Sequence, residues 1–307
     1  MKIIHAAQDL KPGSRKVCLA IGFFDGVHLG HQQIIRQTIT DARRHNAVAL
    51  ALTFDRHPNS VVAPAHVPPL IYSLPQKLRA IEALGPDALL LIHFDKKFSR
   101  QTGEGFIRRL ARDLGRVQSL CVGMDFVFGH QRSGNVALLR KLGAETGFTV
   151  HGLAAVSLDG RIVSSTRIRA AIRAGDLDAA SQMLGRPYAI SGRVVKGDGV
   201  GRRLGFPTAN LEVTGLVLPP NGVYAGLTKV RGKTYHVALN IGFRPTIASA
   251  MRRLCVEAHL LDFDGKLYGG ELTVEIGGKL REEKKFATPA ELRRQISRDV
   301  AALRASD

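Results

Sequence analysis

Short apolar runs alternate with amphipathic stretches over the first half of the chain. Five runs have the length and composition of buried strands: Val17–Ile21, Ala47–Phe54, Ala88–Phe94, Ser119–Val122 and Phe148–Val156. Between them, apolar residues recur at helical spacing in four segments: Gln32–His45, Pro75–Leu84, Gly105–Leu114 and Val136–Glu145. Strands that alternate with helices predict an α/β fold with a parallel, doubly wound sheet, in which ligands bind at the carboxyl ends of the strands.

The pattern changes beyond Tyr188. The apolar runs become short and β-rich, with turn residues between them: Tyr188–Val195, Val223–Val230, Thr234–Asn240, Cys255–Leu261 and Glu271–Ile276. A single helix is expected near the end of the chain, at Pro289–Arg304. Several strands followed by one helix predict a small antiparallel β-barrel.

The boundary between the two patterns lies after a short helical segment, Leu177–Leu184, which ends at Gly185. A length of 307 residues is sufficient for about two domains with a core each. We therefore expect one domain at 1–185 and a second, unrelated domain at 186–307.

The composition limits the cellular compartment and the kinds of binding partner that we expect. The sequence has no apolar span of about 20 residues, and its first residues lack the apolar region of a secretory signal, so we expect a cytoplasmic protein without a membrane partner. The three cysteines are odd in number, far apart and set in apolar runs, which favours buried reduced thiols over a disulfide or a metal site. The net charge of +18 is spread over both halves without a basic tail or interleaved aromatic residues, so we do not expect a nucleic-acid partner.

The first candidate site is the turn after the first strand, IGFFDGVHLGH at Ile21–His31. Its glycines permit close approach of a ligand to the backbone, and His28 and His31 are three residues apart, so both imidazoles can point to one side of a helix. A strand, a tight turn and a helix together aim backbone N–H groups and the positive end of the helix dipole at a phosphate. A glycine-rich loop with two surface histidines is the plainer interpretation, and the flanking strand and helix favour the phosphate site.

Three further loops in the first half carry polar residues. Thr53–Pro58 leads into the proline-rich segment Pro58–Pro69, which is expected to be irregular and is either a flap over the site or a surface crossing. Gly123–Asn135 contains glycines and basic residues, and by itself is best interpreted as a hairpin or solvated loop. Thr166 and Arg169 begin a helical pattern; a hydroxyl there caps the helix by default, but the pair is also suited to a phosphate.

In the second half, polar residues concentrate in the basic loop Lys196–Leu211. Thr208 and Asn210 lie on one face if the chain is extended there, where two neutral oxygens can bind Mg²⁺, although a turn with a local cap is equally compatible. Glu257 interrupts an otherwise apolar strand. It either faces solvent by alternation or acts as a general base, and periodicity does not decide between the two.

Taken together, the motifs of both halves resemble a known family. They are GFFDGVHLGH, TFDRHP, GMDFVFG, SSTRIR, LGRPY, GRRLGFPTANL, NGVYAG, NIGFRPT, VEAHLLDFDGKLYG and LREEKKF, in this order from about Ile21 to Phe286. This series closely resembles the bacterial bifunctional riboflavin kinase/FMN adenylyltransferases, also called FAD synthetases.

For the first domain, the resemblance implies a Rossmann-like nucleotidyltransferase that joins FMN to the AMP part of ATP and releases pyrophosphate. On that basis His28 and His31 stabilise the transition state at the α-phosphate. Asp125 would lie at the nucleotide or flavin site. The residues implied to bind ATP are Gly22, Phe24, Asp25, Gly30, Asp125, Ser165, Thr166 and Arg169.

For the second domain, the resemblance implies a riboflavin kinase barrel that phosphorylates the ribityl 5′-hydroxyl with ATP. Thr208 and Asn210 would coordinate Mg²⁺, and Glu257 would take the proton of the attacking hydroxyl. The residues implied to bind ATP or flavin are Lys196, Gly205, Pro207, Thr208, Asn210 and Arg281.

Two departures from the family pattern bear on these expectations. Arg56 stands where a proline is expected in the first loop, and 248–253 replaces a segment expected to contain glycine beside the kinase site.

The resemblance implies riboflavin, FMN and ATP as substrates, FAD as product and Mg²⁺ as cofactor. The alternative function keeps the fold with only one active domain, the other being a flavin-binding or regulatory module. The sequence does not predict an oligomeric state.

Overall fold

The computed structural model describes residues 1–246 and 249–305, with only the backbone for residues 244–246 and 249–253. Contacts divide the chain into two units. The first contains Met1–Pro69 and Leu74–Ser165, and the second contains Leu70–Ser73 and the chain from Thr166 onwards. Each unit is described by itself.

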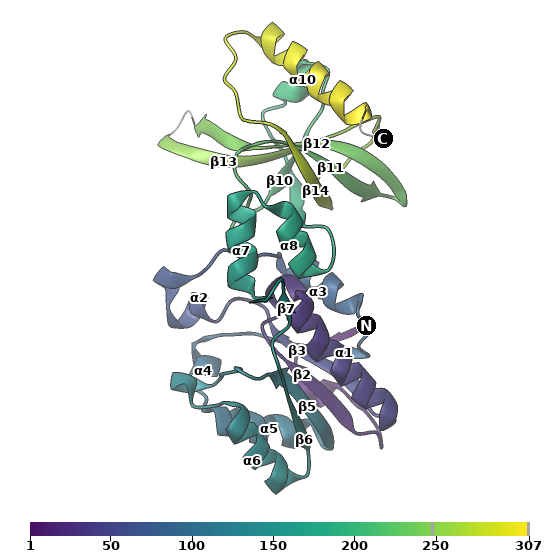
Figure 1. Ribbon diagram of the computed structural model, residues 1–307, viewed down its shortest axis with the longest axis vertical. Helices are drawn as coiled ribbons and strands as arrows, with labels where there is room; N and C mark the ends of the chain where they lie inside the picture. The colour runs from purple at the N-terminus through teal and green to yellow at the C-terminus, as the bar shows by residue number, and fades with distance from the viewer. Residues whose placement is uncertain (247–248, 306–307) are drawn as a thin grey trace. The chain divides into compact units, whose positions relative to one another are not determined.

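The first unit is built on a six-stranded sheet in which every strand pair is parallel, in the order β1-β4-β3-β2-β5-β6. Figure 1 labels the strands β3, β2, β5 and β6 of this sheet. Its strands are β1 (Lys2–Ile4), β2 (Val17–Ile21), β3 (Val48–Phe54), β4 (Ala88–Ile92), β5 (Val117–Gly123) and β6 (Thr149–Leu153). All five residues of β2 are buried, as are the first six of β3, which is typical of a sheet covered on both faces. The parallel, doubly wound sheet expected from the alternating pattern is confirmed.

Helices cover both faces of this sheet. One face packs against α1 (Leu29–Arg44) and α3 (Leu74–Glu82), through side chains such as Ile35 and Ile81. The other packs against α5 (Gly103–Leu114) and α6 (Val136–Thr146), through side chains such as Leu110 and Leu139. The remaining short elements are α2 (Asn59–Val62), α4 (Lys96–Ser99), the β7 (Ser157–Leu158) and β8 (Arg161–Ile162) hairpin, and the 3-10 turns η1 (Ala7–Asp9), η2 (Asp25–Val27), η3 (Pro64–His66) and η4 (His130–Arg132).

The second unit is a closed barrel of six antiparallel strands, in the order β10-β13-β12-β11-β14-β9 with β9 also paired to β10. Figure 1 labels β10, β11, β12, β13 and β14 in this barrel. Its strands are β9 (Ala189–Val195), β10 (Ala209–Glu212), β11 (Gly222–Val230), β12 (Lys233–Thr246), β13 (Ser249–Leu260) and β14 (Glu271–Arg281). The helices are α7 (Ser165–Ala174), α8 (Leu177–Leu184), α9 (Val200–Arg203) and α10 (Pro289–Arg304). The predicted barrel with a terminal helix is confirmed.

The cysteines form no disulfide, and burial raises the pKa of Cys18 and of Cys121, the latter to about 12. Cys255 is only half-buried, so the expectation of a buried thiol was wrong at this position. The reason is alternation along β13, where Val256 and Ala258 are buried in the barrel core and the residue before them faces the opposite side. In the part of the chain that the structure describes, no helix is both long and apolar enough to cross a membrane.

Candidate functional site

The turn between β2 and α1 has an unusual backbone. Phe24 has φ +54°, Gly26 has φ +74° and Val27 has φ +43°, so three of four consecutive residues are in the left-handed region. The 3-10 turn η2 lies inside this segment, and His28 follows it as the N-cap of α1. The turn therefore reverses the chain within a few residues and begins α1 directly at the carboxyl edge of the sheet.

This geometry brings the two histidines together. The rings of His28 and His31 stack with centroids 3.6 Å apart at an interplanar angle of 22°, and the ring of Phe24 contacts His31 edge-on at 5.3 Å. A Cβ at Gly30 would lie 3.3 Å from the His28 ring, so a side chain there would push the ring aside. Both imidazoles thus lie at the N-terminus of α1, where backbone N–H groups and the helix dipole favour an anion.

A hollow of about 360 Å³ opens beside the stacked rings. Six of the residues expected at the ATP site line it: Gly22, Phe24, His28, Gly30, His31 and Asp125. The exposed Asp125 reaches it from the loop after β5, which is the neighbour of β2 in the sheet. The sheet order therefore explains how residues about a hundred positions apart come to line one hollow.

Asp25 and Ser165 lie next to each other, although they are distant in sequence. Asp25 is buried within η2, and the Ser165 hydroxyl donates a hydrogen bond of 3.2 Å to its carbonyl. Ser165 begins α7, followed directly by the exposed Thr166 and, one turn after Ser165, by the buried Arg169. These two residues belong to the second unit.

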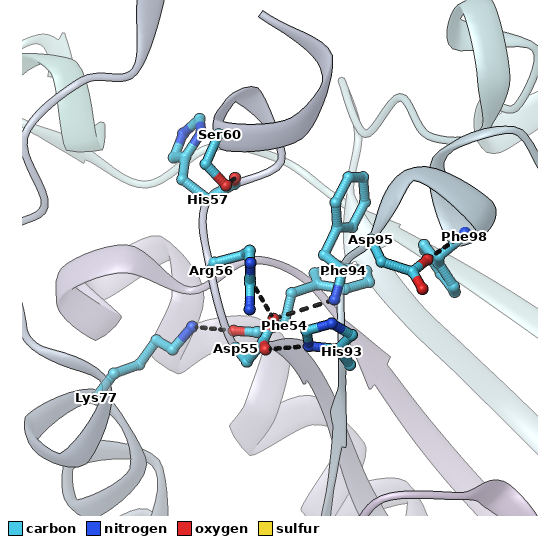
Figure 2. Close-up of polar contacts among 10 residues, drawn as sticks. All are labelled: Phe54, Asp55, Arg56, His57, Ser60, Lys77, His93, Phe94, Asp95 and Phe98. Carbon is cyan, nitrogen blue, oxygen red and sulfur yellow. Dashed lines mark hydrogen bonds and ion pairs between the residues drawn. The ribbon is translucent and has the colours of Figure 1, made fainter. Parts of the chain in front are cut away.

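Sequence reasoning missed a charged cluster at the carboxyl ends of β3 and β4. Figure 2 shows the Asp55 carboxylate beside His93, whose Nδ1 is 2.6 Å away, the N–H of Phe94 at 3.0 Å and the Arg56 side chain at 3.5 Å. Burial acts to raise the pKa of Asp55, but the hydrogen bonds from Phe94 and His93 and the charge of Arg56 outweigh it and lower that pKa. Arg56, the departure from the family pattern, is thus half-exposed and paired with its neighbour in the sequence.

Lys77 on α3 belongs to the same region and is buried, with 3% of its surface exposed. Its ammonium donates to the Phe54 carbonyl at 2.8 Å (Figure 2) and to the Phe23 carbonyl at 3.2 Å. Burial lowers its pKa from 10.5 to about 8, against the attraction of Asp25 and Asp55. One signal was available, since Lys77 is four residues before Ile81 and therefore lies on the apolar side of the predicted helix Pro75–Leu84.

In the second unit, the loop before β10 forms another hollow, of about 290 Å³. Four expected residues line it: Lys196, Pro207, Thr208 and Asn210. Gly197 also lines it, and a Cβ there would overlap the Asn210 side chain, so a side chain at this position would displace Asn210. Gly205 has φ +90° and is not among the residues that line this hollow.

A row of polar side chains crosses the barrel at Glu257. Its partners in the strand register are Asn210 on β10 and Asn240 on β12. The Cys255 thiol lies 3.4 Å from the Asn210 Oδ1 and 3.4 Å from the Glu257 Oε1. Glu257 is on the outer face of its strand, as alternation allows, yet only 9% of its surface is exposed.

Glu257 lines a hollow of about 250 Å³, and so does Thr208, which also borders the hollow of Lys196. Arg281 lies in the hollow of Glu257 as well, held by α10: its Nε and Nη2 donate to the Asp299 carboxylate at 2.8–3.0 Å. Asp299 was missed, although a carboxylate on the apolar face of a predicted helix is a signal for such a pair. Of the departure at 248–253, residue 248 lies outside the described residues, and only the backbone is described for the rest.

Comparison with known proteins gives similarity over both units. Residues 10–167 match the FAD synthetase family, and residues 184–306 match the riboflavin kinase family. The bifunctional riboflavin kinase/FMN adenylyltransferase of Escherichia coli (strain K12) is 39% identical over 303 residues, which cover 97% of this chain and 96% of that protein. The protein of the same name from Pseudomonas fluorescens is 37% identical over 305 residues, covering 99% and 97%.

Among solved structures, the chain is similar to one from Streptococcus pneumoniae described as a macrolide-efflux protein. The two share 26% sequence identity with a TM-score of 0.81, and the match covers 98% of both chains. The fold described above is therefore found in an experimental structure over nearly its full length.

Proposed function

Because the chain belongs to the family of bifunctional riboflavin kinase/FMN adenylyltransferases, we propose that it makes FMN from riboflavin and FAD from FMN, with ATP as co-substrate of both steps. The observation that supports this most strongly is that each unit has its own hollow lined by phosphate-binding residue types. One lies at the histidine pair of the parallel sheet, and the other lies at the basic loop of the barrel. Residues suited to each reaction are present in both halves, which favours two active domains over one silent domain.

For adenylyl transfer, we assign charge stabilisation at the α-phosphate to His28 and His31. Their stacked rings and the N-terminus of α1 concentrate donors where negative charge develops during in-line attack by the FMN phosphate. Gly22, Phe24, Asp25, Gly30 and Asp125 are proposed to shape the nucleotide or flavin pocket. By the family resemblance, we propose that Ser165, Thr166 and Arg169 hold the departing phosphates.

For the kinase, we assign to Glu257 the removal of the proton from the ribityl hydroxyl. Its position in a hollow that also contains Arg281 supports a base facing a flavin, with Arg281 toward the product. Lys196, Pro207 and Gly205 belong to the loop proposed to cover the ATP phosphates. Thr208 borders both hollows and is therefore suited to lie where phosphate and hydroxyl meet.

The donors present fit Mg²⁺ that is shared with ATP. Among the described residues, no group of three or more His, Cys, Asp or Glu side chains is arranged to hold a metal ion, so a cage made of protein alone is not the basis of the proposal. Thr208 and Asn210 offer two neutral oxygens in one hollow, and Mg²⁺ in such enzymes takes one or two protein ligands and completes its shell with phosphates and water. When bound, the ion would neutralise charge on the transferred phosphoryl group.

We propose 1–185 and 186–307 as the functional division, with the adenylyltransferase first. The contact boundary falls earlier, between Ser165 and Thr166, and the two family matches end at 167 and begin at 184. A cytoplasmic location is proposed because both reactions consume ATP and the cysteines form no disulfide.

Chromatography of a single reaction tests the proposal. Purified protein with riboflavin, ATP and Mg²⁺ is expected to accumulate FMN and then FAD. Protein given FMN directly is expected to form FAD and pyrophosphate. If no FMN forms from riboflavin, the proposed kinase activity is refuted. If no FAD forms from added FMN, the proposed adenylyltransferase activity is refuted.

A further inference from the structure

Lys77 presents a buried ammonium that the reaction scheme above does not use. It extends from the first turn of α3 and makes three polar contacts: with the carbonyls of Phe54 at 2.8 Å and Phe23 at 3.2 Å, and with the Thr53 hydroxyl at 3.3 Å. An ammonium has three N–H donors and no acceptor, so its hydrogen-bonding capacity matches these three oxygens. The ring of Phe23 lies under the ammonium, with its centroid 4.3 Å from Nζ.

The three oxygens belong to the carboxyl ends of two neighbouring strands. Thr53 and Phe54 end β3, whereas Phe23 follows β2 and begins the turn toward the histidine pair. The Thr53 hydroxyl itself donates to the Phe23 carbonyl at 2.9 Å, so strand end, turn and ammonium form one network. Phe23 also lines the hollow beside the histidines.

This network is linked to His31 through Phe24, the residue that follows Phe23. The residue after Phe23 is Phe24, whose left-handed backbone starts η2 and whose ring contacts His31. A displacement of the Phe23 carbonyl would therefore move the segment that sets the orientation of His31. On the basis of the proposed adenylyltransferase function, we propose that Lys77 is a positioning residue of adenylyl transfer, which fixes the start of the histidine turn through its protonated ammonium.

The charge of the ammonium is as important as its hydrogen bonds. The charged groups that face it are Asp25 in η2 and Asp55 after β3, and Asp55 is itself paired with His93 and Arg56. A neutral amine has only two N–H donors for three oxygens and no attraction to the Phe23 ring or to these carboxylates. Because burial lowers the pKa of Lys77 to about 8, its charge is lost just above neutral pH.

Three variants test the proposal: Lys77→Met, Lys77→Arg, and Lys97→Met as a control for the loss of an exposed lysine in the same unit. FAD formation from FMN and ATP is measured from pH 6.5 to 10, and circular dichroism with urea unfolding of the same preparations reports whether the first unit is folded. Lys77→Met is expected to lower kcat for FAD formation about 10- to 100-fold, with KM for ATP changed less than about 3-fold and kinase activity retained. Lys97→Met is expected to match the unmodified protein.

The pH profile separates positioning by the ammonium from a merely structural role. In the unmodified protein, kcat for FAD formation is expected to fall as the pH rises through about 8. In Lys77→Arg, this decrease in kcat is expected at a pH at least about one unit higher, because a guanidinium keeps its charge. In Lys77→Met, the residual kcat is expected not to decrease over this pH range. Unchanged kcat in Lys77→Met, or the same fall in all three proteins, overturns the inference.

If Lys77→Met does not fold, as judged by circular dichroism, the comparison of the unmodified protein with Lys77→Arg decides on the same criterion. If the unmodified protein forms no FAD from FMN at any pH, the proposed function is refuted and this inference with it. The two failures are therefore distinguishable.

Discussion

The pKa of Lys77 predicts how the stability of the first unit depends on pH. In the unfolded chain this lysine has its ordinary pKa of 10.5, and in the folded protein burial lowers it to about 8. Between these values the unfolded state binds a proton that the folded state does not, so the free energy of unfolding increases as the pH rises. The contribution is unfavourable below about pH 8 and vanishes above the unfolded pKa.

The structure also sets the size of this effect. The difference between 10.5 and about 8 corresponds to about 3.4 kcal/mol at about 1.36 kcal/mol per pH unit. Because only 3% of Lys77 is exposed, solvent screening does not reduce this figure much. Lys77→Met lacks the titrating group, so the difference in unfolding free energy between the unmodified protein and this variant should increase by about 3 kcal/mol from pH 8 to 10.5.

Urea unfolding followed by circular dichroism measures this difference, since the chain has no tryptophan to serve as a fluorescent probe. Titration of the other lysines, tyrosines and thiols affects both proteins alike and cancels in the comparison. The expected signs are opposite for the two properties: across this range the first unit becomes more stable while its FAD-forming activity falls. A difference that stays constant with pH, or one that decreases, would refute the reasoning.

Four further outcomes are expected. His31→Ala should abolish FAD formation from FMN and spare FMN formation from riboflavin, and Asn210→Asp should do the reverse; both are read from the product chromatogram. Asp299→Asn should destabilise the second unit by about 1.5–3 kcal/mol and raise KM for riboflavin, because it removes the carboxylate that binds the partly buried Arg281 guanidinium; calorimetry and kinase kinetics test this. Iodoacetamide at pH 8 should label the half-buried Cys255 well before the two buried cysteines, and mass spectrometry identifies the site.

Much of the first unit could be predicted because its strands are buried on both faces. Val17–Ile21 was predicted with its exact bounds, since every side chain in it contributes to the core. β1 was missed because three residues, Lys2–Ile4, are too few for a periodic signal; they form a strand only by pairing with β4, more than eighty residues away. The segment Pro58–Pro69, expected to be irregular, contains the short helical turns α2 and η3.

In the barrel, strand positions were predicted better than strand lengths. The strand expected to end at Asn240 continues to Thr246, paired with β13 from Val237 onwards. Part of this extension is not buried: Phe243 and Leu254 are paired with each other and are 44% and 39% exposed. Backbone pairing extends this hairpin beyond the buried part of the barrel, so hydrophobic alternation could not reveal its length.

The residues of the candidate sites also differ in how well their positions could be predicted from the sequence. Residues that follow one another closely, such as His28 and His31, could be placed together from spacing alone. Lys77 and Asp55 could not be placed together in this way, because their environment depends on which strand ends lie side by side. The strand order β1-β4-β3-β2-β5-β6 cannot be predicted from local hydrophobic periodicity. The environment of Glu257 likewise depends on residues from other elements that line the same hollow, including Arg281.

The closure of the barrel has a consequence for the synthesis of the protein. Its first strand, β9, pairs with its last, β14, so that Ala189 is opposite Glu275. At about 5–20 residues per second, a ribosome needs roughly 4 to 17 seconds to add the intervening chain. During this interval β9 has an unpaired edge, whereas every strand of the parallel sheet has already been made. The nascent second half is therefore the part most in need of protection from aggregation until its last strand emerges.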